Sequence, residues 1–158
     1  AVQRCVQKAQ KKGHKQVEHL CRSLHTLCSE FPETRLAVEP GEHLDDLLGF
    51  EVMGWVLDDL SKQGIGYWHD VGRVHLLERL GLPAQGQWLD KYASRMLGVH
   101  LQDAADGEAE MPPGTGQVDF RLIGEYLPED VSQVLDVNPR HGRTEILASV
   151  QYLKDLGF

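Results

Sequence analysis

Acidic and imidazole side chains recur at four well-separated places along this chain. They are Glu39, His69 with Asp70, His100 with Asp103, and Asp136. Two or three carboxylates together with one neutral imidazole make an oxygen-rich ligand set that suits Mn²⁺, Mg²⁺, Co²⁺ or Zn²⁺. A single acidic residue would indicate only a solvated loop, so the prediction of a divalent-metal site depends on the four places together.

Each of these places comes at the end of a short apolar segment that is typical of a buried strand. Strands are predicted at residues 35–39, 65–70, 96–101 and 132–137. Apolar residues at three- and four-residue steps predict helices at residues 17–31, 50–62, 74–94, 120–127 and 143–156, with a break at 81–83. Residues 1–12 are interpreted as an extension of the first helix across Gly13.

The order of these elements predicts the architecture. Strands that alternate with helices at this interval imply right-handed crossovers and a parallel sheet. A doubly wound open sheet would normally carry a Gly-rich phosphate loop after its first strand, and the segment 39–42 lacks the glycines for one. The favoured fold class is therefore α/β, a (β/α) TIM-barrel segment of about four parallel strands with covering helices. In such folds the C-terminal strand ends meet at one mouth.

Composition limits the classes of partner. The chain has 158 residues, with 24 Asp plus Glu against 16 Lys plus Arg, and this net charge of −8 disfavours nucleic acid. No apolar run approaches the roughly 20 residues that cross a bilayer, so no membrane partner is expected. Three cysteines without CxxC or zinc-knuckle spacing fit a reducing, cytoplasmic location. A small-molecule ligand is compatible with all of these features.

Four ordered motifs extend the pattern beyond single residues. They are the stretches Gly66 to Arg73, Leu97 to Asp103, Pro112 to Phe120 and Leu153 to Phe158. Together they resemble the second half of xylose-isomerase-like barrel proteins, which include sugar isomerases, ketose epimerases and the endonuclease IV group. The resemblance covers the chain from about residue 15. It implies that residues 1–158 are the C-terminal half of such a barrel, strands five to eight, and that the N-terminal half is absent from the chain.

The resemblance also implies a reaction. In that family Glu, Asp, His and Glu from the fifth to eighth strands hold a divalent metal, and those positions fall on Glu39, Asp70, His100 and Asp136. The implied activity is a metal-dependent sugar or sugar-phosphate isomerase or epimerase that moves a proton through an enediolate. Glu39 and Asp136 would be the catalytic carboxylates. One divalent ion, Mn²⁺ foremost, is the expected cofactor.

Several residues depart from the family pattern. Asp136 replaces the usual Glu, Arg73 stands where relatives offer His, and Gln102 and the pair Ala109-Glu110 replace further ligands. These losses argue against a nuclease site with three metals. A guanidinium can clamp a carboxylate or phosphate, so we expect substrate contacts from Arg73, together with His69 and Asp103. The alternative to an enzyme is a catalytically inactive barrel-like scaffold with a degenerate metal site.

Two further expectations concern the inner face of the sheet and the segment that follows the third predicted strand. The predicted strands are apolar on both faces, which suits a sheet between helices outside and opposing barrel strands within. Self-association or a missing N-terminal half is therefore expected to cover the inner face. The segment from residue 103 to 119 is predicted to be a long, polar, solvated loop.

Overall fold

The computed structural model describes residues 13–158 apart from residues 42 and 45, together with residues 2, 4, 6 and 8. Most of the predicted helical extension at residues 1–12 lies outside the described residues. The chain then forms helix α2 (His14–Glu30), whose apolar positions recur at helical spacing as predicted. None of the described helices is long and apolar enough to cross a membrane.

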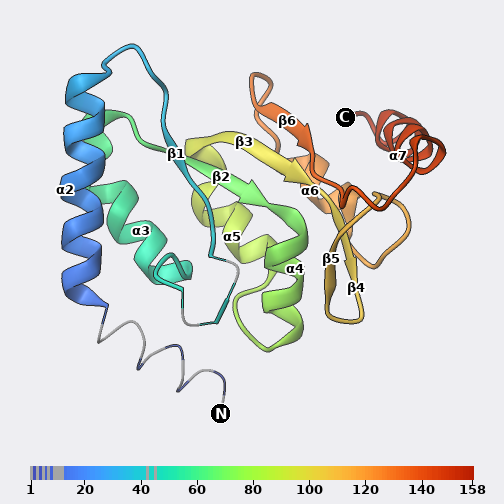
Figure 1. The fold of residues 1–158 in the computed structure, drawn as a ribbon, viewed down its shortest axis with the longest axis horizontal. Coiled ribbons are helices and arrows are strands. Elements are labelled where there is room, and N and C mark those ends of the chain that lie inside the picture. Colours follow the sequence, from blue (N-terminus) through green and yellow to red (C-terminus); the bar gives the residue numbers. More distant parts are fainter. Residues whose placement is uncertain are drawn as a thin grey trace.

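A four-stranded parallel sheet forms the centre of the molecule (Figure 1). Its order is β1 (Ala37–Val38), β2 (Gly66–Asp70), β3 (Met96–Leu101) and β6 (Ser132–Leu135). The connections contain α3 (Phe50–Asp59), η1 (Ser61–Gln63), α4 (Val71–Arg79), α5 (Gln85–Tyr92), η2 (Ala93–Arg95) and α6 (Phe120–Tyr126), and α7 (Arg143–Asp155) follows the last strand. The predicted alternation of strands and helices is therefore present.

One predicted loop is a hairpin instead. Strands β4 (Asp103–Ala105) and β5 (Glu108–Met111) pair antiparallel within the segment that was expected to be a solvated loop. The turn between them contains Asp106 and Gly107, with φ values of 52° and 87°. Asp-Gly with both residues at positive φ is the preferred two-residue hairpin turn, so the signal was present in the sequence and was missed.

The two faces of the central sheet have different surroundings. On one face, the strand residues Val38, Tyr67, Val99 and Leu101 are buried, and in Figure 1 helices α3, α5 and α6 lie on this far side. The near face carries no helix among the described elements. Burial of the strand side chains under helices accounts for the core of the protein, because each fully buried large apolar side chain contributes about 1.5 to 3 kcal/mol.

The open face is more polar than predicted. A groove of about 410 Å³ runs across it, lined by Arg35, Ala37, Glu39, Trp68, Leu97, His100 and Ser132. The expectation of strands apolar on both faces holds only in part, because charged and polar residues share the open face with Trp68, Leu97 and the 41% exposed Val134. Trp68 is the largest apolar side chain in this groove. Its indole lies over Gly98, where a Cβ atom would come within 2.2 Å of the ring.

Candidate metal centre

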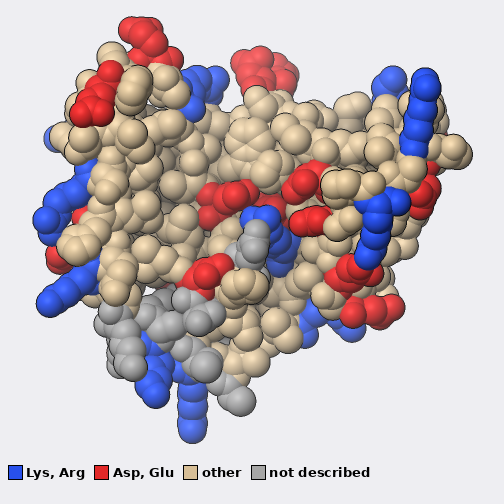
Figure 2. Space-filling view, viewed as in Figure 1, with Lys and Arg blue, Asp and Glu red and all other residues tan. Residues whose placement is uncertain are grey.

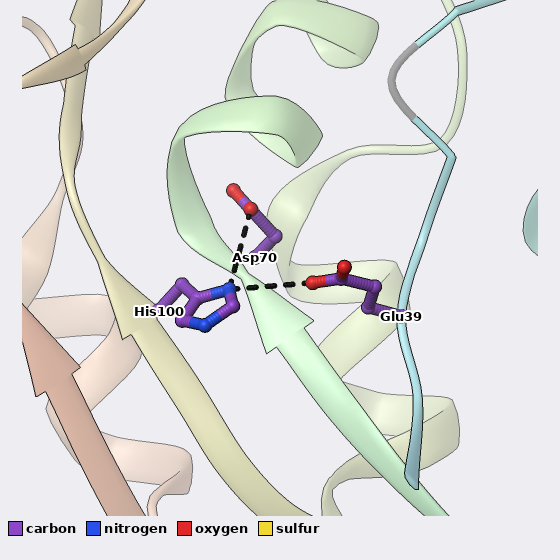
Figure 3. Close-up of side chains that lie close together, drawn as sticks. All are labelled: Glu39, Asp70 and His100. Atoms are coloured by element: carbon purple, nitrogen blue, oxygen red, sulfur yellow. Dashed lines mark ion pairs between the residues drawn. The ribbon is translucent and has the colours of Figure 1, made fainter. Parts of the chain in front are cut away.

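Three acidic and imidazole residues meet at the C-terminal ends of neighbouring strands. Glu39 follows β1, Asp70 is the last residue of β2, and His100 is its partner in register on β3. Because the strands are parallel, their carboxyl ends lie at one edge of the sheet. Figure 3 shows the two carboxylates pointing toward the imidazole.

The distances in this group suit a common ion. His100 Nδ1 lies 3.3 Å from Glu39 Oε2 and 3.7 Å from Asp70 Oδ2, and one ligand atom from each residue lies within 4.8 Å of the others. Ligand atoms at about 2.1 Å from one ion are roughly 3.0 to 3.4 Å apart in octahedral or tetrahedral geometry. Glu39 Oε2 and His100 Nδ1 are buried without a hydrogen-bond partner among the described residues. A divalent cation between them would satisfy both atoms.

Asp70 is held rigidly by local structure. It is fully buried, and its Oδ1 accepts a hydrogen bond of 2.9 Å from the backbone N–H of Arg73. Asp70 is thus the N-cap of α4, a position that satisfies a free helix N–H and places a negative charge at the positive end of the helix dipole. The cap also explains why α4 begins at Val71, directly after the strand, and not near residue 74 as predicted.

Arg73 extends into the same site. Its Nε lies 3.3 Å from Asp70 Oδ2 and its Nη1 3.6 Å from Glu39 Oε1, and its side chain is 18% exposed. Figure 2 shows acidic side chains gathered around the middle of the open face, with a basic side chain among them. The carboxylates of Glu39 and Asp70 and the guanidinium of Arg73 leave this group with one net negative charge when His100 is neutral, and the nearby Asp136 adds a second.

Asp136 adjoins the group of three without belonging to it. It comes one residue after β6, and its backbone N–H donates to the carbonyl of Leu101 at 3.1 Å. Its Oδ2 accepts a hydrogen bond of 3.3 Å from Gln102 Nε2, and the same amide nitrogen lies 3.0 Å from both oxygens of Asp70. The fourth expected ligand is therefore connected to Asp70 through Gln102.

The pKa of His100 reports the charge around it. The carboxylate of Asp70, 3.7 Å from Nδ1, raises this pKa above its usual value, opposed by desolvation and assisted by the charges of Glu39 and Asp136. A metal ion and a proton compete for the same Nδ1 lone pair. Metal affinity at this site should therefore begin to fall, as pH is lowered, at a higher pH than for an ordinary histidine.

Two of the expected substrate contacts, Asp103 and the Nδ1 atom of His69, have hydrogen-bond partners inside the protein. His69 is fully buried on the helix-covered face, with Nδ1 2.6 Å from the Tyr67 hydroxyl. Asp103 accepts hydrogen bonds from the backbone N–H groups of Ala104, Gly114, Gly116 and Val118. These contacts hold a strand and a loop in place. Substrate binding by either residue stays a prediction to which the geometry adds no support.

Gln102 is the functional candidate that the sequence reasoning missed. It is fully buried, whereas the sequence indicates it only as a replacement for a family ligand. The available signal was its position two residues after His100, because alternate residues of an extended segment share a face.

Comparison with known proteins supports the fold. No protein-family model and no curated protein sequence matches the chain. The crystal structure of 3-keto-D-glucoside 4-epimerase, YcjR, from E. coli in its apo form is similar, with a TM-score of 0.68 and 16% sequence identity over 88% of this chain. The match covers 53% of the epimerase, so the chain spans about half of its length. The predicted fold class, a partial TIM-barrel-like sheet with covering helices, is confirmed.

Proposed function

We propose that this chain carries the metal site of a divalent-metal-dependent sugar or sugar-phosphate isomerase or epimerase. The observation that supports this most directly is the convergence of Glu39, Asp70 and His100 within 4.8 Å at the ends of three neighbouring strands. The fold likeness to a solved 3-keto-D-glucoside 4-epimerase supports the substrate class. The open groove beside the three residues offers space for a small polar ligand.

The proposed roles come from the family resemblance, and the positions of Glu39, Asp70 and His100 support them. Glu39, Asp70 and His100 would hold the ion, with Asp136 as a fourth ligand. When bound, a divalent cation, Mn²⁺ foremost, supplies positive charge that stabilises an enediolate. Isomerisation needs one group to remove a proton beside a carbonyl and another to return it. Glu39 and Asp136 suit these tasks because β1 and β6 are the outer strands of the sheet, so the two carboxylates approach the groove from opposite sides.

Arg73 is proposed to anchor the substrate. Its guanidinium already lies beside Glu39 and Asp70, and its planar donors can bind a sugar oxygen or a phosphate. In the absence of substrate the same guanidinium neutralises part of the acidic site. The shorter Asp136, in place of a Glu, would draw the proton-transferring oxygen back by about 1.5 Å, which is enough to slow catalysis.

The surroundings of the site lead to a proposal about assembly. We assign residues 1–158 to strands five to eight of a barrel, closed by four further β/α units or by a second copy. Apolar side chains are exposed at both ends of the sheet, Leu27 and Phe31 on or just after α2, and Leu147 on α7. Sedimentation velocity on the 158-residue chain should detect self-association. A compact monomer with measurable turnover would contradict this assignment.

Location and other partners follow the same proposal. Cys21 and Cys28 are free thiols, which fits a reducing cytoplasm. The net charge of −8 continues to disfavour nucleic acid as a partner.

The test combines metal binding with turnover. Purified protein should bind about one Mn²⁺ per chain, measured by calorimetric titration, and His100→Ala should abolish this binding. His25→Ala, which alters an exposed histidine on α2, is the matched control and should bind as the unaltered chain does. Failure of the unaltered chain to bind Mn²⁺, or unchanged binding by His100→Ala, would remove the proposal.

The rival function is an inactive scaffold with a degenerate site. The observation in its favour is the pairing of Arg73 with Glu39 and Asp70, two of the four proposed ligands. An aldose–ketose and epimerase assay with added Mn²⁺ separates the two functions. Mn²⁺ binding without turnover, in protein shown to be fully assembled, would favour the scaffold.

A further inference from the structure

Among the described residues of the site, Gln102 is the one whose side-chain amide lies between two carboxylates, those of Asp70 and Asp136. Its side chain is completely buried. Nε2 donates to both oxygens of Asp70 at 3.0 Å and to Oδ2 of Asp136 at 3.3 Å. Two carboxylates that face one amide are thereby kept close to each other despite their like charges. A buried amide with this many charged acceptors is expected to have a defined role.

The orientation of the Gln102 amide is determined by a backbone donor. Oε1 accepts a hydrogen bond of 2.6 Å from the N–H of Glu110, which identifies this atom as the oxygen and directs the NH₂ group toward the carboxylates. Glu110 is held in turn by Asn138. Its carbonyl accepts the Asn138 backbone N–H at 2.9 Å, and its Oε2 accepts the Asn138 side-chain amide at 3.1 Å. The hairpin therefore fixes Gln102 to the segment that carries Asp136.

The first turn of α4 leaves room for this side chain. A Cβ atom on Gly72 would lie 2.7 Å from Gln102 Oε1 and 2.9 Å from its Cδ. Because Gln102 is buried and hydrogen-bonded at both ends of its amide, it could not shift aside without loss of those bonds. Gly72 and Glu110 together set the position of the amide.

We propose that Gln102 is a positioning residue, which orients the carboxylates of Asp70 and Asp136 toward the metal site. This inference rests on the proposed function. It adds a residue that touches neither the ion nor the substrate and acts through two residues that do. Partners of this kind fix the orientation and basicity of metal ligands, and their removal typically costs about 10- to 100-fold in metal affinity.

The experiment measures Mn²⁺ affinity in matched variants. Gln102→Met keeps the approximate volume and removes the donors, and Gly72→Ala displaces Gln102 without altering it. Both should bind Mn²⁺ about 10- to 100-fold more weakly. The control is Gln151→Met, which removes a surface amide that donates to Asp155 Oδ1 at 2.7 Å. The control should bind as the unaltered chain does. Unchanged affinity in Gln102→Met would overturn the inference.

A double-mutant cycle distinguishes positioning from a purely structural role. In an Asp136→Asn background, the affinity lost through Gln102→Met should be at least about fivefold smaller than in the unaltered chain, because one of the carboxylates that Gln102 orients is gone. A residue that only stabilises the hairpin would lower the affinity by the same factor in both backgrounds. Equal factors would therefore reject the positioning role.

A measurement without metal separates this inference from the proposed function. In the metal-free chain, the side-chain amide hydrogens of Gln102 should exchange with solvent at least about tenfold more slowly than those of Gln151, as followed by NMR. Rapid exchange would overturn the inference even if Mn²⁺ binds. Slow exchange in a chain that binds no Mn²⁺ would remove the proposed function. The inference that Gln102 orients the carboxylates of Asp70 and Asp136 would still stand.

Discussion

The two faces of the central sheet place the same residue types in opposite electrostatic surroundings. His69 and Asp70 are neighbours in β2, yet His69 lies under the helices and the buried Asp70 points toward Glu39 and His100 on the opposite face. Burial lowers the pKa of His69 to about 4, although Asp70 acts in the opposite direction. His100, on the open face, has a raised pKa because carboxylates surround it. The side of the strand, more than the residue type, thus decides whether a histidine can meet a cation.

The largest expected difference between the faces concerns packing. Trp88 is 1% exposed and stacks on Tyr67 beneath the sheet, so Trp88→Ala should lower the free energy of unfolding by about 3 to 5 kcal/mol. Trp68→Ala makes the same change on the open face, where the indole is half-buried. It should cost less than about 2 kcal/mol. Urea unfolding of both variants measures the contrast, and equal losses would contradict it.

A pH titration of stability examines the covered face alone. The pKa of His69 is about 4 in the folded chain and 6.5 in its ordinary state, so protonation favours the unfolded chain. The stabilisation from a neutral His69 is complete above pH 6.5 and decreases as pH falls toward 4. By pH 5 the loss should be about 2 kcal/mol.

The matched variant for this titration is His69→Asn, which keeps an acceptor near the Tyr67 hydroxyl. Its free energy of unfolding should change less between pH 7 and pH 5 than that of the unaltered chain. An identical pH dependence in both proteins would show that His69 is not the group responsible.

A smaller effect, on Mn²⁺ affinity, is expected on the open face when Arg73 is replaced by a neutral residue. Arg73→Gln removes the guanidinium from beside Glu39 and Asp70, so Mn²⁺ should bind about tenfold more tightly, equivalent to about 1.4 kcal/mol. Turnover should fall if Arg73 anchors substrate. Arg79→Gln, an exposed arginine on the same helix, is the control and should leave both quantities unaltered. Weaker Mn²⁺ binding by Arg73→Gln would contradict the idea that the Arg73 guanidinium and Mn²⁺ compete for the same carboxylates.

The smallest effect on the free energy of unfolding is expected for a surface ion pair that lies on neither face of the sheet. Arg95 Nη2 lies 2.7 Å from Asp58 Oδ1, but both side chains are well exposed. Asp58→Asn should change the free energy of unfolding by less than about 1 kcal/mol. A larger loss in thermal or urea unfolding would mean that short distance alone can make a surface pair stabilising.

The sequence predicted those parts of the fold that depend on local periodicity. The alternation of apolar strands with helices was sufficient for a parallel sheet, and Gly81 and Pro83 correctly placed the break between α4 and α5. The strand ends were less accurate, because pairing with a neighbour decides them. Strand β1 is limited to Ala37–Val38, within the predicted segment 35–39.

The site was only partly accessible to sequence reasoning. The strand ends indicated Glu39, His69 with Asp70, His100 with Asp103, and Asp136, and the family resemblance selected Glu39, Asp70 and His100, which the structure brings together, along with Asp136. The bridge from Gln102 to Asp70 and Asp136 joins residues 32 and 34 positions apart in the chain, and no local pattern encodes it. The roles of His69 and Asp103 depend on which face or loop their side chains enter, and contacts with residues distant in the chain decide this.

The indole of Trp68 gives the open face an optical signal of its own. Its ring centroid lies 5.1 Å from that of His100, in the space that Gly98 leaves by having no side chain. A protonated imidazole quenches nearby indole emission more strongly than a neutral one does. Of the other two tryptophans, Trp88 is buried on the opposite face and Trp55 is exposed on α3. Fluorescence of Trp68, isolated by replacing the other two with Phe, would therefore follow the state of His100 in real time without any added dye.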